Sequence, residues 1–256
     1  MIFDTHAHYD DSAFDPDRAA LLSALPQAGV CRIVNQGTNL QTSEQSIQLA
    51  EKYSYIYAAV GIHPECLEDL PDGYIDCIRS LASHPKVVAI GEIGLDYHYD
   101  IPRDRQQAVF EQQLELARDL DMPVTVHDRE AHGDTLDLLM KYRPRGIVHC
   151  FSGSVEMALE VVKLGMYIGV GGVATFKTAK KLKDVVREVP PERIVLETDA
   201  PYLAPVPFRG KRCDSSMISR TALALADILG RSPDDILKTT CRNAYEVYGM
   251  TDGGKL

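Results

Sequence analysis

Short apolar runs alternate with longer amphipathic stretches along the whole chain, and no other feature limits the possible folds as strongly. The runs are about four to eight residues long and rich in β-branched side chains, which is typical of buried strands. They predict strands over residues 2–8, 32–37, 55–62, 87–93, 123–128, 146–150, 167–173 and 194–198. The stretches between and after them predict helices over residues 16–28, 41–53, 72–84, 103–121, 132–142, 154–165, 178–188, 215–229 and 233–247. A strand followed by a helix, repeated eight times, predicts an α/β fold of the (β/α)8 TIM barrel type.

Size and composition favour a single domain over residues 1–256. With 45% hydrophobic residues, the chain of 256 residues is near the upper limit for one hydrophobic core. No Pro-, Gly- or Ser-rich linker and no short repeat divides it. Polar residues interrupt the longest apolar runs before they reach membrane-spanning length. We therefore expect a soluble protein that does not bind membranes.

The N-terminus and the cysteines both predict a cytoplasmic protein. The first residues, MIFDTHAHYDD, lack the basic start and the apolar segment of a secretion signal. The six cysteines show no CxxC pairing, which fits reduced thiols better than disulfides or a thiolate zinc site. Nothing in the sequence points to an obligate protein partner.

The net charge of −10 argues against a protein that coats nucleic acid by bulk electrostatics. An acidic enzyme can still bind phosphates locally. Bound metal ions, together with the basic cluster of Arg209, Lys211 and Arg212, could confine positive potential to one cleft.

Six potential metal ligands lie at or just beyond the ends of predicted strands. They are His6, His8, Glu92, His127, His149 and Asp199. In a (β/α)8 barrel the carboxyl ends of the strands meet at the face that carries the chemistry, so these side chains should converge. Imidazole and carboxylate together suit Zn, Mn, Fe or Ni, and one tetrahedral ion needs only about three or four protein ligands. Six candidates therefore predict two ions.

Each candidate also has a simpler interpretation, because a single histidine that ends a strand is more often a hydrogen-bonded packing residue. Six such residues together would be costly to bury unpaired, and a metal is the usual solution. Among the other histidines, we expect His84 on the surface, His98 in a tyrosine-rich loop and His132 at the start of a helix. His63 follows the third strand at the same mouth of the barrel.

Seven motifs in order resemble one known family. The motifs DTHAH, GIHP, GEIGLDY, HDREA, HCFSG, ETDAPYL and RGKR are similar to those of the TatD family of metal-dependent deoxyribonucleases, within the amidohydrolase-like superfamily. The resemblance runs from residue 2 to about residue 248. It implies two divalent ions (Zn, Mg, Mn or Ni), with His6, His8 and Asp199 on one ion, His127 and His149 on the other, and Glu92 bridging them.

The resemblance also implies a reaction and a substrate. It implies hydrolysis of phosphodiester bonds in DNA or another nucleic acid by a metal-activated water, with 3′-exonuclease-like activity. Asp199 would accept the proton of that water, and the catalytic residues would be Asp199 and Glu92. Further residues near the ligands should face the substrate, although Arg129 could equally form a surface salt bridge. They are His63, Asp96, Arg129, Ser152, Tyr202, Arg209 and Lys211.

One segment departs from the family pattern. Phe208 replaces a histidine before RGKR, and Cys213, Asp214 and Ser215 replace Asn-Glu-Pro. Phe208 could stack on an unpaired base or serve only in loop packing. Two other functions stay open: a hydrolase of another ester or amide, such as a D-aminoacyl-tRNA deacylase, and a non-catalytic binding protein with a structural metal site.

Overall fold

Eight parallel strands form the central sheet of the computed structural model, which describes residues 1–68, 70–251 and 254–255. Each strand pairs with its neighbour in sequence, and a bridge between Ala7 and Ala200 joins the first strand to the segment after the last. The strands are β1 (Ile2–Ala7), β2 (Val30–Gln36), β3 (Ile56–Val60), β4 (Val87–Asp96), β5 (Val124–Arg129), β6 (Gly146–Val148), β7 (Tyr167–Val170) and β8 (Ile194–Leu196). The predicted (β/α)8 barrel is confirmed.

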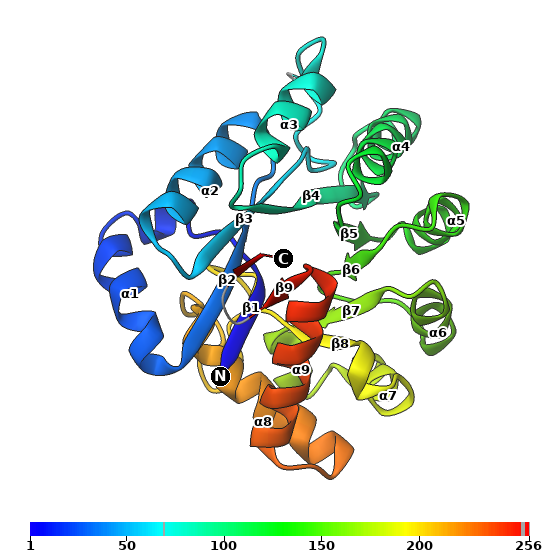
Figure 1. The fold of residues 1–256 in the computed structure, drawn as a ribbon. Coiled ribbons are helices and arrows are strands. Elements are labelled where there is room, and N and C mark those ends of the chain that lie inside the picture. The colour runs from blue at the N-terminus through cyan, green and yellow to red at the C-terminus, as the bar shows by residue number, and fades with distance from the viewer. Residues whose placement is uncertain (69, 252–253, 256) are drawn as a thin grey trace.

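The helices form an outer ring around the strands (Figure 1). They are α1 (Arg18–Ala24), α2 (Leu40–Lys52), α3 (Tyr74–Ala82), α4 (Arg103–Asp119), α5 (His132–Tyr142), α6 (Val155–Lys163), α7 (Lys180–Glu188), α8 (Ile218–Leu229) and α9 (Pro233–Val247). Within the described residues, no helix combines the length and the apolar character that crossing a membrane requires.

Several predicted boundaries were wrong by a few residues. The helix predicted over residues 16–28 ends as α1 at Ala24, and a 3-10 helix, Leu25–Ala28, follows because Pro26 has no N–H for the α-helical ladder. β4 and β5 extend to the polar residues Asp96 and Arg129, which pair with each other. β7 ends at Val170, before the 3-10 helix Gly172–Thr175.

Two apolar layers support the barrel. A large cluster of buried side chains includes Phe110 and Ile168 and packs the helices against the strands. A smaller cluster lies at the amino end of the barrel, where Phe3 stacks on Tyr248 and the Tyr248 hydroxyl donates to the Thr5 carbonyl oxygen at 3.1 Å. β9 (Met250–Thr251) and β10 (Gly254–Lys255) form a short antiparallel pair after α9.

Helix α4 fixes the backbone of two loops at the opposite, carboxyl end. The buried Gln113 side chain accepts from Ile62 N at 2.7 Å and donates to Ile62 O at 2.9 Å, beside His63. The buried Gln106 side chain makes the same pair of bonds to Asp96, at 2.8 and 2.7 Å. The side-chain amides of Gln113 and Gln106 therefore hold the loops after β3 and β4. They supply the hydrogen bonds that neighbouring strands no longer provide where the sheet ends.

Candidate metal centre

The first strand and the last strand bring three potential ligand atoms together. Nε2 of His6 lies 3.1 Å from Nε2 of His8, and Asp199 Oδ1 lies 3.7 Å from the first and 3.5 Å from the second. The backbone supports this arrangement, because Asp199 N donates to His6 O at 2.9 Å. Neighbouring ligands of a tetrahedral zinc ion at about 2.0–2.1 Å are roughly 3.3 Å apart. These three residues therefore fit a divalent ion.

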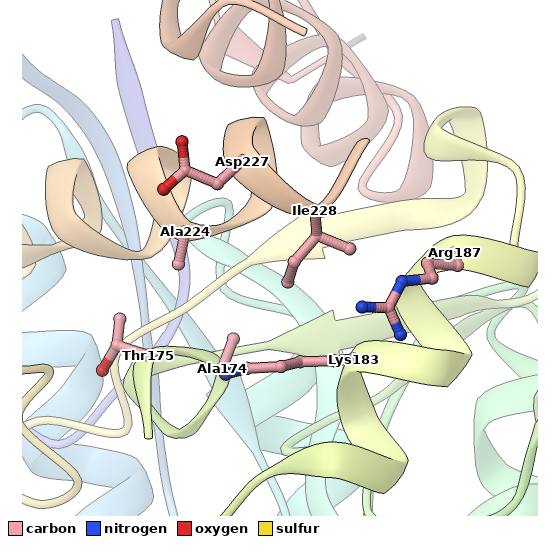
Figure 2. A pocket seen from close by; sticks show the side chains of 7 residues that line it. All are labelled: Ala174, Thr175, Lys183, Arg187, Ala224, Asp227 and Ile228. Atoms are coloured by element: carbon pink, nitrogen blue, oxygen red, sulfur yellow. The ribbon is translucent and has the colours of Figure 1, made fainter. Parts of the chain in front are cut away.

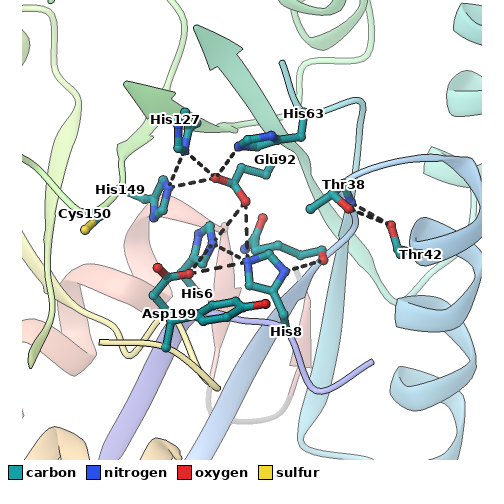
Figure 3. Close-up of polar contacts among 12 residues, drawn as sticks. His6, His8, Thr38, Thr42, His63, Glu92, His127, His149, Cys150 and Asp199 are labelled. Atoms are coloured by element: carbon teal, nitrogen blue, oxygen red, sulfur yellow. Dashed lines mark hydrogen bonds and ion pairs between the residues drawn. The ribbon is translucent and has the colours of Figure 1, made fainter. Parts of the chain in front are cut away.

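Glu92 lies between this group and a second group of imidazoles (Figure 3). Its Oε2 is 3.3 Å from His6 Nε2 and 3.5 Å from His8 Nε2. Its Oε1 is 2.8 Å from His149 Nε2 and 3.0 Å from His127 Nδ1. The carboxylate thus turns one oxygen to each group, as a ligand that bridges two ions would.

His63 joins the second group, although the sequence predicted it only as a substrate contact. Its Nε2 lies 3.5 Å from Glu92 Oε1, and His63, Glu92 and His127 form a cluster whose ligand atoms all lie within 4.8 Å of one another. GIHP stands at the end of the third strand like the motifs of the other candidates, so the signal was present in the sequence. The ring offers one more ligand for a second ion.

Glu197 is a buried carboxylate that the sequence analysis missed. It forms a ligand cluster with His6 and His149, its Oε1 lies 3.8 Å from His149 Nδ1, and the same oxygen accepts the N–H of Cys150. Burial raises the pKa of Glu197 to about 8, although the nearby His149 lowers it. The signal was a second carboxylate in the same apolar run, two residues before Asp199.

The charges of the cluster compensate one another. Burial alone would raise the pKa of Glu92, but His149, His6 and His63 hold it well below its usual range. Burial would likewise lower the pKa of His8 and His127, yet the facing carboxylates raise these pKa values to about 9 and about 10. His8 and His127 therefore hold protons as counterions of the carboxylates, whereas burial lowers the pKa of His6 to about 4 and leaves that ring neutral. A divalent ion that binds here displaces the protons of His8 and His127.

Asp96 and Asp4 hold two of the histidines from behind. The sequence predicted that Asp96 faces the substrate. In the structure Asp96 is buried and its Oδ2 lies 2.9 Å from His127 Nε2, so its carboxylate contacts an imidazole and does not face the mouth. Asp4 accepts from His6 N at 3.2 Å, from Thr198 Oγ1 at 2.6 Å and from Ser215 Oγ at 2.6 Å. Asp96 thus contacts the ring of a candidate ligand, whereas Asp4 holds the backbone of another.

The segment that departs from the family pattern has structural contacts. Ser215 is buried, and besides Asp4 its hydroxyl meets the Tyr9 hydroxyl at 2.8 Å. Asp214 caps the 3-10 helix Ser215–Met217 through a bond from Ser216 N at 2.9 Å. Phe208 packs partly buried against the main core, which favours loop packing over an exposed stacking surface.

The remaining predicted substrate contacts lie at the carboxyl end of the barrel and are exposed. Arg129 ends β5, and Ser152 follows β6. Tyr202, Arg209 and Lys211 lie on the long loop after β8. The other histidines lie outside the cluster, as expected: His84 is 3.3 Å from Glu51, His98 is 2.9 Å from Glu130, and His132 begins α5.

A separate cavity of about 390 Å³ lies between α7 and α8 (Figure 2). It is lined by Lys183 and Arg187 from α7 and by Asp227 and Ile228 from α8, among others. None of the six predicted ligands lines it, so it is not part of the metal centre.

The chain is similar to known proteins along nearly its whole length. The family model described as TatD related DNase matches residues 3–249. The uncharacterized metal-dependent hydrolase YabD of Bacillus subtilis is 40% identical over 252 residues, which cover 97% of this chain and 99% of the relative. The 3′-5′ ssDNA/RNA exonuclease TatD of Citrobacter koseri is 33% identical, with 97% and 99% covered. The crystal structure of the TatD homologue YjjV from Escherichia coli superimposes with a TM-score of 0.92 at 35% identity, covering 98% of each chain.

Proposed function

Because the chain belongs to the TatD related DNase family of metal-dependent hydrolases, we propose that it is a nuclease that removes nucleotides from the 3′ end of single-stranded nucleic acid. The Citrobacter koseri relative is named for this activity. The observation that carries the proposal is the Glu92 carboxylate, whose two oxygens face separate groups of ring nitrogens. A carboxylate in this position suits a pair of divalent ions, the arrangement that many phosphodiester-cleaving enzymes use.

Divalent ions at such a pair lower the pKa of water and neutralise the phosphate oxygens during an in-line displacement. The protein residues would supply the remaining functions. His6, His8 and Asp199 would hold one ion, and His127, His149 and His63 would hold the second. Glu92 would bridge the two ions and keep them at a fixed separation.

Asp199 would accept the proton from the attacking water. Burial would raise its pKa, but the facing His8, His6 and His149 lower it below the usual value, so the carboxylate is ionised at neutral pH. Its Oδ1 lies 3.7 Å from His6 Nε2 and 3.5 Å from His8 Nε2, so the carboxylate would hold an ion and take the proton at the same place.

Arg129 would bind the substrate's phosphate. Its guanidinium makes no hydrogen bond or ion pair with any residue that the structure describes, which leaves its fork of donors free. In a chain with a net charge of −10, an unpaired arginine at the mouth of the barrel would attract a phosphate locally.

The proposal is tested by metal reconstitution with a panel of substrates. The metal-free protein is loaded separately with Mg, Mn, Zn or Ni and incubated with end-labelled single-stranded DNA, double-stranded DNA, RNA and D-aminoacyl-tRNA. We expect stepwise shortening of the single strands from the 3′ end. Cleavage of the aminoacyl ester alone would indicate a deacylase, and no metal-dependent turnover of any substrate would indicate a binding protein.

A further inference from the structure

Tyr99 is a half-exposed aromatic residue beside the candidate metal centre. It is 46% exposed and lies on the loop after β4, three residues beyond Asp96. Asp96 Oδ1 accepts from His98 N at 2.9 Å, and Asp96 Oδ2 contacts His127. The loop that carries Tyr99 is therefore anchored on a carboxylate that also orients a candidate metal ligand.

A buried side chain fixes both ends of this loop. Gln106 Nε2 donates to Asp96 O at 2.7 Å and to Ile101 O at 3.1 Å, so it spans the segment on which Tyr99 lies. The ring of His98 meets the Tyr99 ring edge to face, with the centroids 5.2 Å apart. Tyr99 is thus an apolar surface held in place before any ligand arrives, which reduces the entropy lost on binding.

The guanidinium of Arg129 lies over the Tyr99 ring. Its Cζ is 5.5 Å from the ring centroid, and the backbone oxygen of Arg129 accepts from Tyr97 N at 2.9 Å. The guanidinium also interacts electrostatically with Asp96, but it makes no hydrogen bond or ion pair in the part of the chain that the structure describes. Its N–H donors therefore remain free beside a ring that is 46% exposed. A nucleotide has the matching chemistry, namely a flat base and an anionic phosphate.

Apolar surface also faces solvent across the barrel mouth. Of the seven large hydrophobic side chains that are exposed in the described part of the chain, four lie in the loops after β4 and β8. They are Tyr99, Tyr202, Leu203 and Val206. Because β4 and β8 are opposite strands in a ring of eight, the candidate metal centre lies between these two surfaces. A single strand that crosses the mouth could place bases on both sides of the centre.

We propose that Tyr99 and Arg129 form a nucleotide subsite, in which the Tyr99 ring stacks on an unpaired base and Arg129 binds a phosphate of that nucleotide. This subsite rests on the proposed nuclease function and specifies which residues would recognise an unpaired base. Bases in a duplex are stacked on both faces, so they reach an aromatic platform only after unstacking.

The subsite is tested by the affinity of the metal-loaded protein for fluorescent single-stranded oligonucleotides with hydrolysis-resistant phosphorothioate linkages. Tyr99→Ala should weaken binding about tenfold, the effect expected from the loss of one base–aromatic stack. Tyr99→Phe keeps the ring and should restore the affinity. Tyr142→Ala is the matched control, because Tyr142 also has a cation over its ring, Lys141 at 4.9 Å, but ends α5 away from the mouth.

A scan with single abasic residues identifies the base concerned. At one particular position, counted from the 3′ end, an abasic residue should weaken binding to the wild type about tenfold. With that oligonucleotide, Tyr99→Ala should cause no further loss of affinity. Equal affinities of wild type and Tyr99→Ala would overturn the subsite. It would also be overturned if Tyr99→Ala weakened binding by the same factor at every abasic position. Hydrolysis of ordinary oligonucleotides is measured in parallel. Tyr99-dependent binding without hydrolysis would refute only the nuclease function. Hydrolysis with binding that does not depend on Tyr99 would refute only the subsite. The absence of both binding and hydrolysis would refute both proposals.

Discussion

Glu92 is the residue on which the two-ion proposal depends most directly. Replacing it with Ala should reduce bound metal and abolish activity, because its carboxylate faces both groups of imidazoles at 2.8–3.5 Å. Elemental analysis and turnover are measured on the same preparation. Glu188→Ala on the outer helix α7 is the control and should keep both values. Unchanged metal content and normal rates in Glu92→Ala would show that the two-ion assignment is wrong.

Asp199→Asn separates metal binding from proton transfer. Asp199 has a φ of 61°, a conformation that Asn adopts readily, so the loop should keep its shape. The amide can still offer an oxygen to an ion but cannot accept a proton at neutral pH. We expect most of the metal to remain and kcat to fall by about 10²- to 10⁴-fold. A kcat near that of wild type would assign the base elsewhere, with Glu92 as the nearest substitute.

Arg129→Ala tests the phosphate contact independently of Tyr99. Losing one phosphate contact should raise KM for oligonucleotides and reduce the slope of log affinity against log salt by about 0.7 for a single strand. Affinity is measured across a salt series for wild type, Arg129→Ala and Arg118→Ala. Arg118 is an exposed control near the other end of the barrel, in the last turn of α4. Equal slopes and equal affinities for wild type and Arg129→Ala would exclude the phosphate contact.

At the scale of the elements, the packing of β7 against β8 controls the position of Glu197. A Cβ on Gly169 would overlap the Glu197 carboxylate, which lies next to His149. Gly169→Ala should therefore lower the free energy of unfolding by about 1–3 kcal/mol, as overpacking usually does, and should reduce bound metal. Urea unfolding and elemental analysis measure the two effects.

The matched control is Gly133→Ala in α5. A Cβ at Gly133 meets no atom within 4 Å, so this variant should be as stable as wild type or slightly more stable. If both alanine variants unfolded at the same urea concentration, Glu197 would not be held by the close approach of β7.

The barrel could be predicted because its strands are short apolar runs separated by amphipathic helices. The ends of β4 and β5 could not be predicted, because Asp96 and Arg129 are polar and pair only through the register of neighbouring strands. Likewise, periodicity places Asp96 near the mouth, but only the bond to His127 shows that its carboxylate points inward. Sequence therefore indicates which residues end the strands, whereas tertiary packing decides what each side chain contacts.

For the whole molecule, the candidate centre joins segments that are distant in sequence. The ligand groups come from β1, the β3 loop, β4, β5 and the segments after β6 and β8, and contacts of Glu92 connect them. Bound ions would therefore cross-link most of the barrel, and their binding free energy would add to the free energy of unfolding. Without ions, the same cluster holds several ionisable groups at close range, so the stability of the folded barrel depends on how protons are distributed among them.

Removal of metal should therefore lower the melting temperature. An ion at a concentration 100 times its Kd adds about 2.7 kcal/mol, which corresponds to roughly 5–10 °C in a domain of this size. Thermal unfolding is followed with and without chelator, and the lost stability should return when metal is restored. Glu92→Ala should respond less to the chelator, because its centre is already incomplete. Identical melting temperatures with and without chelator, in a protein shown to contain metal, would mean that the ions do not cross-link the folded barrel.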